Sequence, residues 1–184
     1  MNTSSSTPTP SGPDGLVHGL IETLRQEEAE LARLAAHFEQ QLDALRGQRQ
    51  DDHEQAMHAA SEAIGTLSRL RARRERQTRL VGRVLRLDGE DVTLQQLAAA
   101  VDSHSATGPW GADLLEARAA VREQTKNTRE ICEQLDFALQ YAVGLGREML
   151  QAMQDLDRPP TSVYTATGHT SRAAVPRSLV NKVG

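Results

Sequence analysis

The stretch that decides the fold is GADLLEARAAVREQTKNTREICEQLDFALQYAVGLGREMLQAMQDLD, residues 111–157. Mostly apolar residues recur in this stretch at alternating steps of three and four positions, which places them on one face of an α-helix. The series is Leu114, Ala117, Val121, Gln124, Thr128, Ile131, Leu135, Ala138, Ala142, Leu145, Met149, Ala152 and Leu156. It predicts one helix over residues 111–157, roughly 60 Å or more long at about 1.5 Å per residue. The two prolines that follow, Pro159 and Pro160, end it.

Two earlier stretches show the same helical periodicity. The first contains Val17, Ile21, Leu24, Glu28, Leu31, Ala35, Phe38, Leu42 and Leu45, and it predicts a helix over 15–46. The second contains Met57, Ala60, Ile64, Leu67, Leu70, Val81, Val84 and Leu85, and it predicts a helix over 52–87. Gly47 separates the two, and Asp51 or Asp52 is the expected N-cap of the second helix. Similar lengths and a short connection favour antiparallel neighbours.

A short helix is predicted over 93–101, where Leu94, Leu97, Ala98 and Val101 share one side. Period-2 alternation persists nowhere, so no sheet is expected. The predicted fold is therefore all-α: an elongated antiparallel helical bundle or coiled coil of three long helices plus a short one, over residues 14–157. Residues 1–13, nearly all Ser, Thr, Pro, Gly and Asn, are predicted to be a disordered tail, and residues 158–184 a flexible one.

Charge and cysteine content bear on compartment and partners. Residues 158–184 carry four basic residues and no acidic one, so the net charge of −4 divides into +4 there and −8 over residues 1–157. This acidic body favours protein partners over nucleic acid. The single Cys132, the absence of an apolar run of about 18 residues and an N-terminus unlike a signal peptide predict a cytoplasmic protein without stable membrane insertion.

An arginine run in the second helix is the strongest argument for nucleic acid. Its members are Arg69, Arg71, Arg73, Arg74, Arg76, Arg79, Arg83 and Arg86. Most of them share a face that could follow phosphates, but no aromatic residues for base stacking are interleaved with them. A solvated face with salt bridges is the favoured interpretation. Arg74 points instead toward the apolar stripe, and it is predicted to snorkel or to pair with a Glu of a neighbouring helix.

No catalytic, cofactor or metal site is predicted. His53 and His58 are spaced i, i+5, which puts them about 140° apart on a helix, whereas the zinc motif H-E-x-x-H needs about 40°. Gly144 and Gly146 follow no strand and open no helix, so they do not form a phosphate loop, although a close helix neighbour or a kink would explain them. Trp110 and Phe38 are expected to anchor the bundle, and no enzyme is expected.

Several short motifs accompany this order of helices: RARRERQTRLVGRVLRL at 71–87, TLQQLA at 93–98, TKNTR at 125–129 and Tyr-x-x-x-Gly at 164–168. Together with the order of helices, they resemble the FlgN family of flagellar secretion chaperones. The resemblance covers roughly residues 16–172. It departs from the family's N-x-x-N-G-like element: with Asn127 as the second Asn, Gln124 stands at the first and Thr128 replaces the Gly.

The resemblance implies a cytosolic chaperone of the hook–filament junction proteins FlgK and FlgL that delivers them to the type III export gate and its ATPase-associated components. In the proteins that this chain resembles, the C-terminal region holds the client. The apolar stripe of the last helix could accept a client's amphipathic helix, unless the same residues close the intramolecular bundle. The candidate client-binding residues are Ile131, Leu135, Ala138, Leu139, Ala142, Leu145, Met149, Met153, Val163 and Tyr164.

Two other functions remain open on the sequence. A self-associating coiled-coil scaffold, including a homodimer, could use the same apolar stripes. A nucleic-acid binder could use the Arg69–Arg86 face. The tail after Pro160 also carries Val163, Tyr164, Val175, Leu179 and Val180, a set that could clasp a client or cover its groove.

Overall fold

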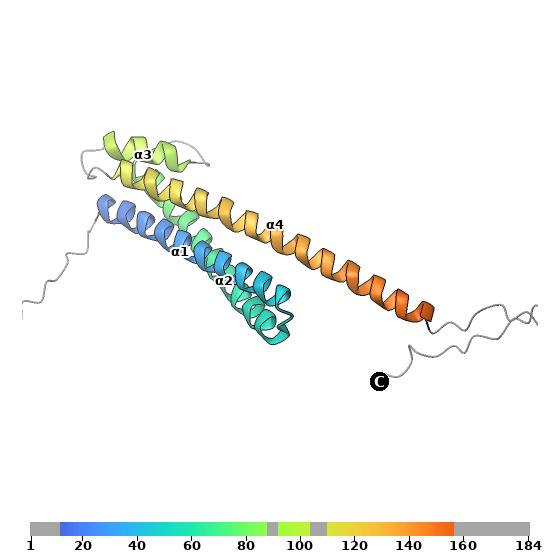
Figure 1. Cartoon of the computed structure of the whole chain (residues 1–184). Helices are drawn as coiled ribbons and strands as arrows, with labels where there is room; N and C mark the ends of the chain where they lie inside the picture. The colour runs from blue at the N-terminus through green and yellow to red at the C-terminus, as the bar shows by residue number, and fades with distance from the viewer. Residues whose placement is uncertain (1–11, 88–91, 104–109, 157–184) are drawn as a thin grey trace, which may run out of the picture. The chain divides into compact units, whose positions relative to one another are not determined.

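The structure, a computed structural model, describes residues 12–87, 92–103 and 110–156 (Figure 1). They form four helices, α1 (Pro13–Arg46), α2 (Gln50–Val84), α3 (Leu94–Ser103) and α4 (Gly111–Leu156). No strand is found within these three ranges, so the all-α prediction is confirmed for them. The two predicted tails lie outside the described residues, apart from Gly12 and Pro13.

The chain divides into two units, residues 1–138 and 139–184. The first unit contains α1, α2, α3 and α4 as far as Ala138. In the second unit the structure describes residues 139–156, which are the remainder of α4.

Helix α1 ends at a tight turn that starts α2 earlier than the sequence predicted. Gly47 N–H donates to the carbonyl of Asp43 at 3.0 Å, and Gln48 has a left-handed φ of 53°. The turn therefore lets α2 begin at Gln50, with Arg49 rather than an aspartate at the N-cap position. Asp51 and Asp52 lie in the first turn, where carboxylates interact favourably with the helix dipole.

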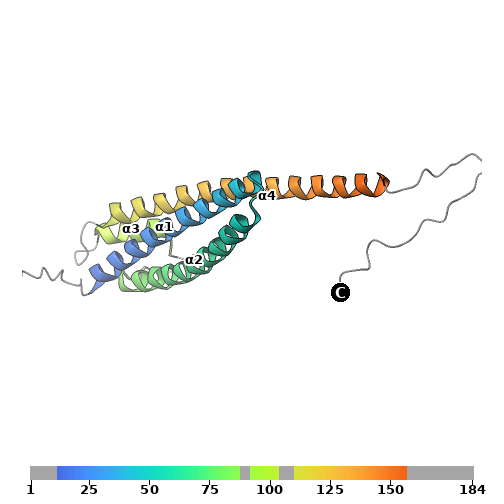
Figure 2. The same cartoon turned by 60° about the horizontal axis from the view of Figure 1, so that its bottom comes forward.

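Helices α1 and α2 form an antiparallel hairpin, visible in Figures 1 and 2. Two hydrogen bonds fix their register: Gln77 Nε2 donates to the carbonyl of Gly19 at 3.2 Å, and Gln41 Nε2 donates to that of Ala56 at 3.5 Å. Residues near the start of α1 therefore lie beside residues near the end of α2.

The buried stripe of α2 consists mainly of small side chains. Ala56, Ala60, Ala63 and Leu67 are all at most 5% exposed. Met57, Ile64 and Val84, which the periodicity had placed on the core stripe, are 49%, 52% and 37% exposed. The buried face of α2 is thus offset by about one residue from the positions of the larger apolar side chains. The side chains that α2 packs into the interior are mainly the alanines.

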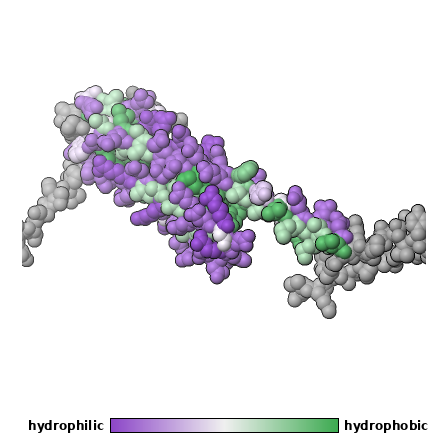
Figure 3. Space-filling model, in the orientation of Figure 1, coloured by the Kyte–Doolittle hydropathy of each residue, from purple (hydrophilic) through white to green (hydrophobic). Residues whose placement is uncertain are grey.

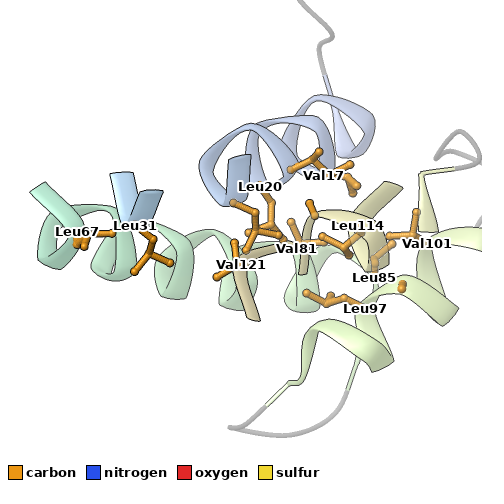
Figure 4. Packing of buried hydrophobic residues seen from close by; sticks show 14 of the residues in the cluster. Val17, Leu20, Leu31, Leu67, Val81, Leu85, Leu97, Val101, Leu114 and Val121 are labelled. Atoms are coloured by element: carbon orange, nitrogen blue, oxygen red, sulfur yellow. The ribbon is translucent and has the colours of Figure 1, made fainter. Parts of the chain in front are cut away.

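All four helices contribute to one core in the first unit (Figure 4). Its best-buried members are Val17, Leu20, Ile21, Leu24, Val81, Leu97, Ala98, Val101 and Leu114. The predicted inner side of α3 is confirmed at Leu97, Ala98 and Val101, which are at most 2% exposed. The short helix α3 therefore closes the end of the bundle where α2 ends and α4 begins.

The α3–α4 junction depends on a glycine. Gly111 N–H, at the start of α4, donates to Asp102 Oδ1 at 2.9 Å. A Cβ at Gly111 would overlap the Asp102 carboxylate, so a larger residue would displace this cap. A negative side chain at a helix N-terminus is also favoured by the helix dipole.

Candidate functional site

The hairpin contains a buried ion pair that fixes α1 against α2. Arg74 Nη1 lies 2.7 Å from Glu27 Oε2, and Arg71 Nε lies 3.5 Å from Glu27 Oε1. The Glu27 side chain is 2% exposed. The prediction that Arg74 meets a Glu of a neighbouring helix is confirmed. The partner is Glu27, whereas the periodic series had placed Glu28, which is half-buried, on the stripe.

A buried threonine joins α4 to α1. Thr128 Oγ1 lies 3.1 Å from the carbonyl oxygen of Leu31 and 2.7 Å from that of Gln124. Thr128 is 6% exposed, so its hydroxyl is satisfied inside the bundle. This polar member of the α4 series therefore belongs to the core.

Trp110 fastens the start of α4 to the start of α1. Its indole Nε1 donates to Asp14 Oδ1, and its ring lies 5.6 Å from the ring of His18, centroid to centroid, with the planes at 60°. Trp110 and Phe38 are both partly buried and pack against the core. The prediction that these two aromatic residues anchor the bundle is confirmed.

The candidate client-binding residues divide into three groups by exposure. Ile131 and Leu135 are 7% and 5% exposed, so they belong to the interior of the first unit and offer no free surface. They continue the α4 face that carries Thr128, which contacts α1. Ala138 and Leu139 are half-buried, whereas Ala142, Leu145, Met149 and Met153 are exposed. Val163 and Tyr164 lie outside the described residues.

The second unit carries an apolar stripe that begins at the half-buried Leu139 and continues through the exposed residues Ala142, Leu145, Met149, Met153 and Leu156. Their spacing of three and four residues places them on one helix face. The side chains of Met149, Met153 and Leu156 are 59%, 62% and 85% exposed. Figure 3 shows hydrophobic and hydrophilic residues on different sides of this segment.

More apolar side chains on α4 are exposed than the periodic series had picked out. Phe137 is 73% exposed, Tyr141 67%, Val143 53% and Leu150 61%. Val143 and Leu150 widen the exposed stripe on one side, while Phe137 and Tyr141 lie off it. The sequence carried a signal for these additional exposed residues. Residues 137–156 contain more apolar residues than a narrow stripe with alternating steps of three and four needs.

A match to a family model identifies the family of this chain. The family model described as FlgN protein matches residues 16–172. The chain belongs to the FlgN family. No curated protein and no solved structure matches it. FlgN proteins are flagellar export chaperones, and this membership confirms the resemblance found in the sequence.

In this FlgN protein, no helix in the described ranges packs closely on Gly144 and Gly146. A Cβ added at Gly144 or Gly146 would meet no atom within 4 Å, so no close neighbour in the described residues accounts for these glycines.

Cys132 is a free, exposed thiol. No group of three or more His, Cys, Asp or Glu in the described ranges is placed to hold a metal ion. None of the four described helices is both long and apolar enough to cross a membrane.

Part of the arginine run is committed to ion pairs. Arg71 and Arg74 interact with Glu27, and Arg79 Nη2 lies 4.0 Å from Glu75 Oε2. These pairs agree with the interpretation of this face of the FlgN chain as partly salt-bridged. Arg73, Arg76, Arg83 and Arg86 make no ion pair with any residue in the ranges that the structure describes.

Proposed function

We propose that this FlgN-family chaperone binds hook–filament junction proteins of the FlgK and FlgL type in the cytoplasm and prevents their premature assembly. It then delivers them to the flagellar type III export gate and its ATPase-associated components. The observation that supports the client-binding step is the exposed apolar stripe of residues 139–156. The stripe would hold an amphipathic helix of the client.

The physical basis is helix-in-groove recognition, in which an amphipathic helix is held through apolar anchors at spacings of three and four. Leu145, Met149, Met153 and Leu156 present such anchors, each at least 46% exposed. Fully burying a side chain of this kind contributes about 1.5–3 kcal/mol. Methionine adds adaptability because its flexible thioether fits differently shaped partners. One surface could therefore accept related but distinct clients.

The test compares two variants of the full chain in calorimetric titrations with purified FlgK and FlgL. In the first, Leu145, Met149 and Met153 are replaced by Gln, which keeps good helix formers on the exposed stripe. In the control, Arg147→Gln and Glu148→Gln alter the polar side of the same segment, where both residues are exposed. We expect the stripe variant to lose affinity by about a hundred-fold or more, and the control to bind like the parent.

Self-association of the stripe is the competing function. Light scattering after size-exclusion chromatography separates the two. A chaperone forms a defined complex with FlgK or FlgL, whereas a scaffold forms oligomers alone that the Gln substitutions at 145, 149 and 153 disperse. Equal binding of FlgK and FlgL by the parent and the stripe variant would rule out this surface as the client site.

A further inference from the structure

A second surface of this protein combines positive charge with an apolar floor. A hollow of about 960 Å³ in the first unit is lined by five arginines, Arg74, Arg79 and Arg83 from α2 and Arg118 and Arg122 from α4. Glu75 is the one acidic residue among the described residues that line it. We call this hollow the arginine pocket.

Three of these guanidinium groups have no counter-ion among the described residues. Arg74 is paired with the buried Glu27, and Arg79 lies 4.0 Å from Glu75. Arg83, Arg118 and Arg122 make no ion pair with any residue in 12–87, 92–103 or 110–156. Within the described ranges, the pocket thus holds positive charge without a paired acid on two different helices.

The placement of these charges is unfavourable for the free protein. Arg79 and Arg83 are spaced i, i+4 on α2, and Arg118 and Arg122 have the same spacing on α4. Like charges at this spacing repel each other and destabilise a helix. Here both repelling pairs line one hollow, so a bound anion would relieve the repulsion on α2 and α4 together.

The floor of the pocket narrows the choice of anion. We use this name for the apolar part of the lining, which consists of Leu24, Leu87, Val92, Leu94 and Val121. A small inorganic anion would leave this apolar floor unused. Single-stranded nucleic acid is held by aromatic side chains on which bases stack, and no described residue of the lining is aromatic. A ligand that carries both carboxylates and an apolar side chain matches both parts of the lining.

We propose that the arginine pocket binds an acidic peptide segment of a partner protein. Its carboxylates pair with Arg83, Arg118 and Arg122, and one of its apolar side chains rests on the floor near Leu94 and Val121. The planar guanidinium group suits this role because it can donate two parallel hydrogen bonds to one carboxylate. The pocket shares no residue with the exposed stripe of residues 139–156, so the proposal does not depend on the client-binding function.

The experiment measures fluorescence anisotropy of a fluorescein-labelled peptide in which Glu and Leu alternate, titrated with the full chain. The pocket variant is R83Q/R122Q. The matched control is R73Q/R76Q, because Arg73 and Arg76 are exposed on the same helix, outside the pocket and without an ion pair in the described ranges. Circular dichroism establishes that both variants keep the parent's helix content.

We expect R83Q/R122Q to weaken peptide binding by about ten-fold or more, and R73Q/R76Q to change it less than about two-fold. Equal losses in the two variants would show non-specific attraction and overturn the proposal. Tighter binding of a labelled oligothymidylate, or equal binding of an all-Glu peptide, would overturn the choice of ligand. If peptide binding appeared only after Asp88, Glu90 and Asp91 were changed to amides, the occupants of the pocket would be acidic residues of the chain itself. This result would overturn the proposal of a partner protein.

Discussion

Replacing Arg74 by methionine tests the buried ion pair of the hairpin. The substitution leaves the Glu27 carboxylate 2% exposed with Arg71 as its remaining partner, 3.5 Å away and 52% exposed. Removing one member of a buried pair costs about 3–5 kcal/mol, because the other charge stays buried without compensation. Arg71 remains and the Arg74 side chain is 26% exposed, so we expect a loss of about 2–4 kcal/mol of unfolding free energy.

Urea denaturation followed by far-ultraviolet circular dichroism measures this loss, with the slope m as a check that the same surface unfolds. The matched control is Arg73→Met, at an exposed position one residue away, with an expected change within about 0.5 kcal/mol. In the double variant Glu27→Leu/Arg74→Met both charges are gone, so we expect stability within about 1 kcal/mol of the parent or above it. If Arg74→Met cost no more than Arg73→Met, or if the double variant were as unstable as Arg74→Met, the reasoning would be refuted.

Three further predictions concern the start of α4, its last third and the chain after it. Trp110→Phe keeps a ring against the core but loses the indole donor to Asp14, so unfolding free energy should fall by about 0.5–1.5 kcal/mol in urea; no change would mean that the hydrogen bond contributes nothing. Ala at Gly144 and Gly146 meets no neighbour and should favour the helix by about 1 kcal/mol each, seen as slower amide exchange in residues 139–156; unchanged exchange would contradict this. Deleting residues 159–184 should change client affinity, upward if the tail covers the stripe and downward if it clasps the client, and unaltered affinity would discard both roles.

Helix content was predictable from the sequence because each long stretch repeats its apolar residues at the helical period. The orientation of α2 was not. Its large apolar residues Met57 and Ile64 are exposed, while Ala56, Ala60 and Ala63 are buried. Periodicity within one helix indicates that a stripe exists, but the face that packs depends on how closely two backbones approach. The same limit applies to Glu27 and Glu28, which are neighbours in the sequence. Glu27 has an arginine of α2 as its partner, and Glu28 has none in the described ranges.

The candidate site was predictable in composition and not in exposure. Ile131, Leu135, Leu145 and Met149 belong to one unbroken series along α4. The first two are buried, and the last two are 46% and 59% exposed. Nothing in the spacing differs between them, because the difference is made by residues far away in sequence that cover one stretch of the helix. The arginine pocket likewise joins charges of α2 and α4 that no local motif connects.

Trp110 gives the protein an optical probe of its own. It is the single tryptophan of the sequence, and its indole contacts Asp14 and His18 within the first unit. Its fluorescence emission will therefore change when that unit opens and stay constant when residues 139–156 unfold or become ordered. Read together with ellipticity, which follows every helix, the natural fluorophore lets changes in the two units be timed separately without attaching a dye.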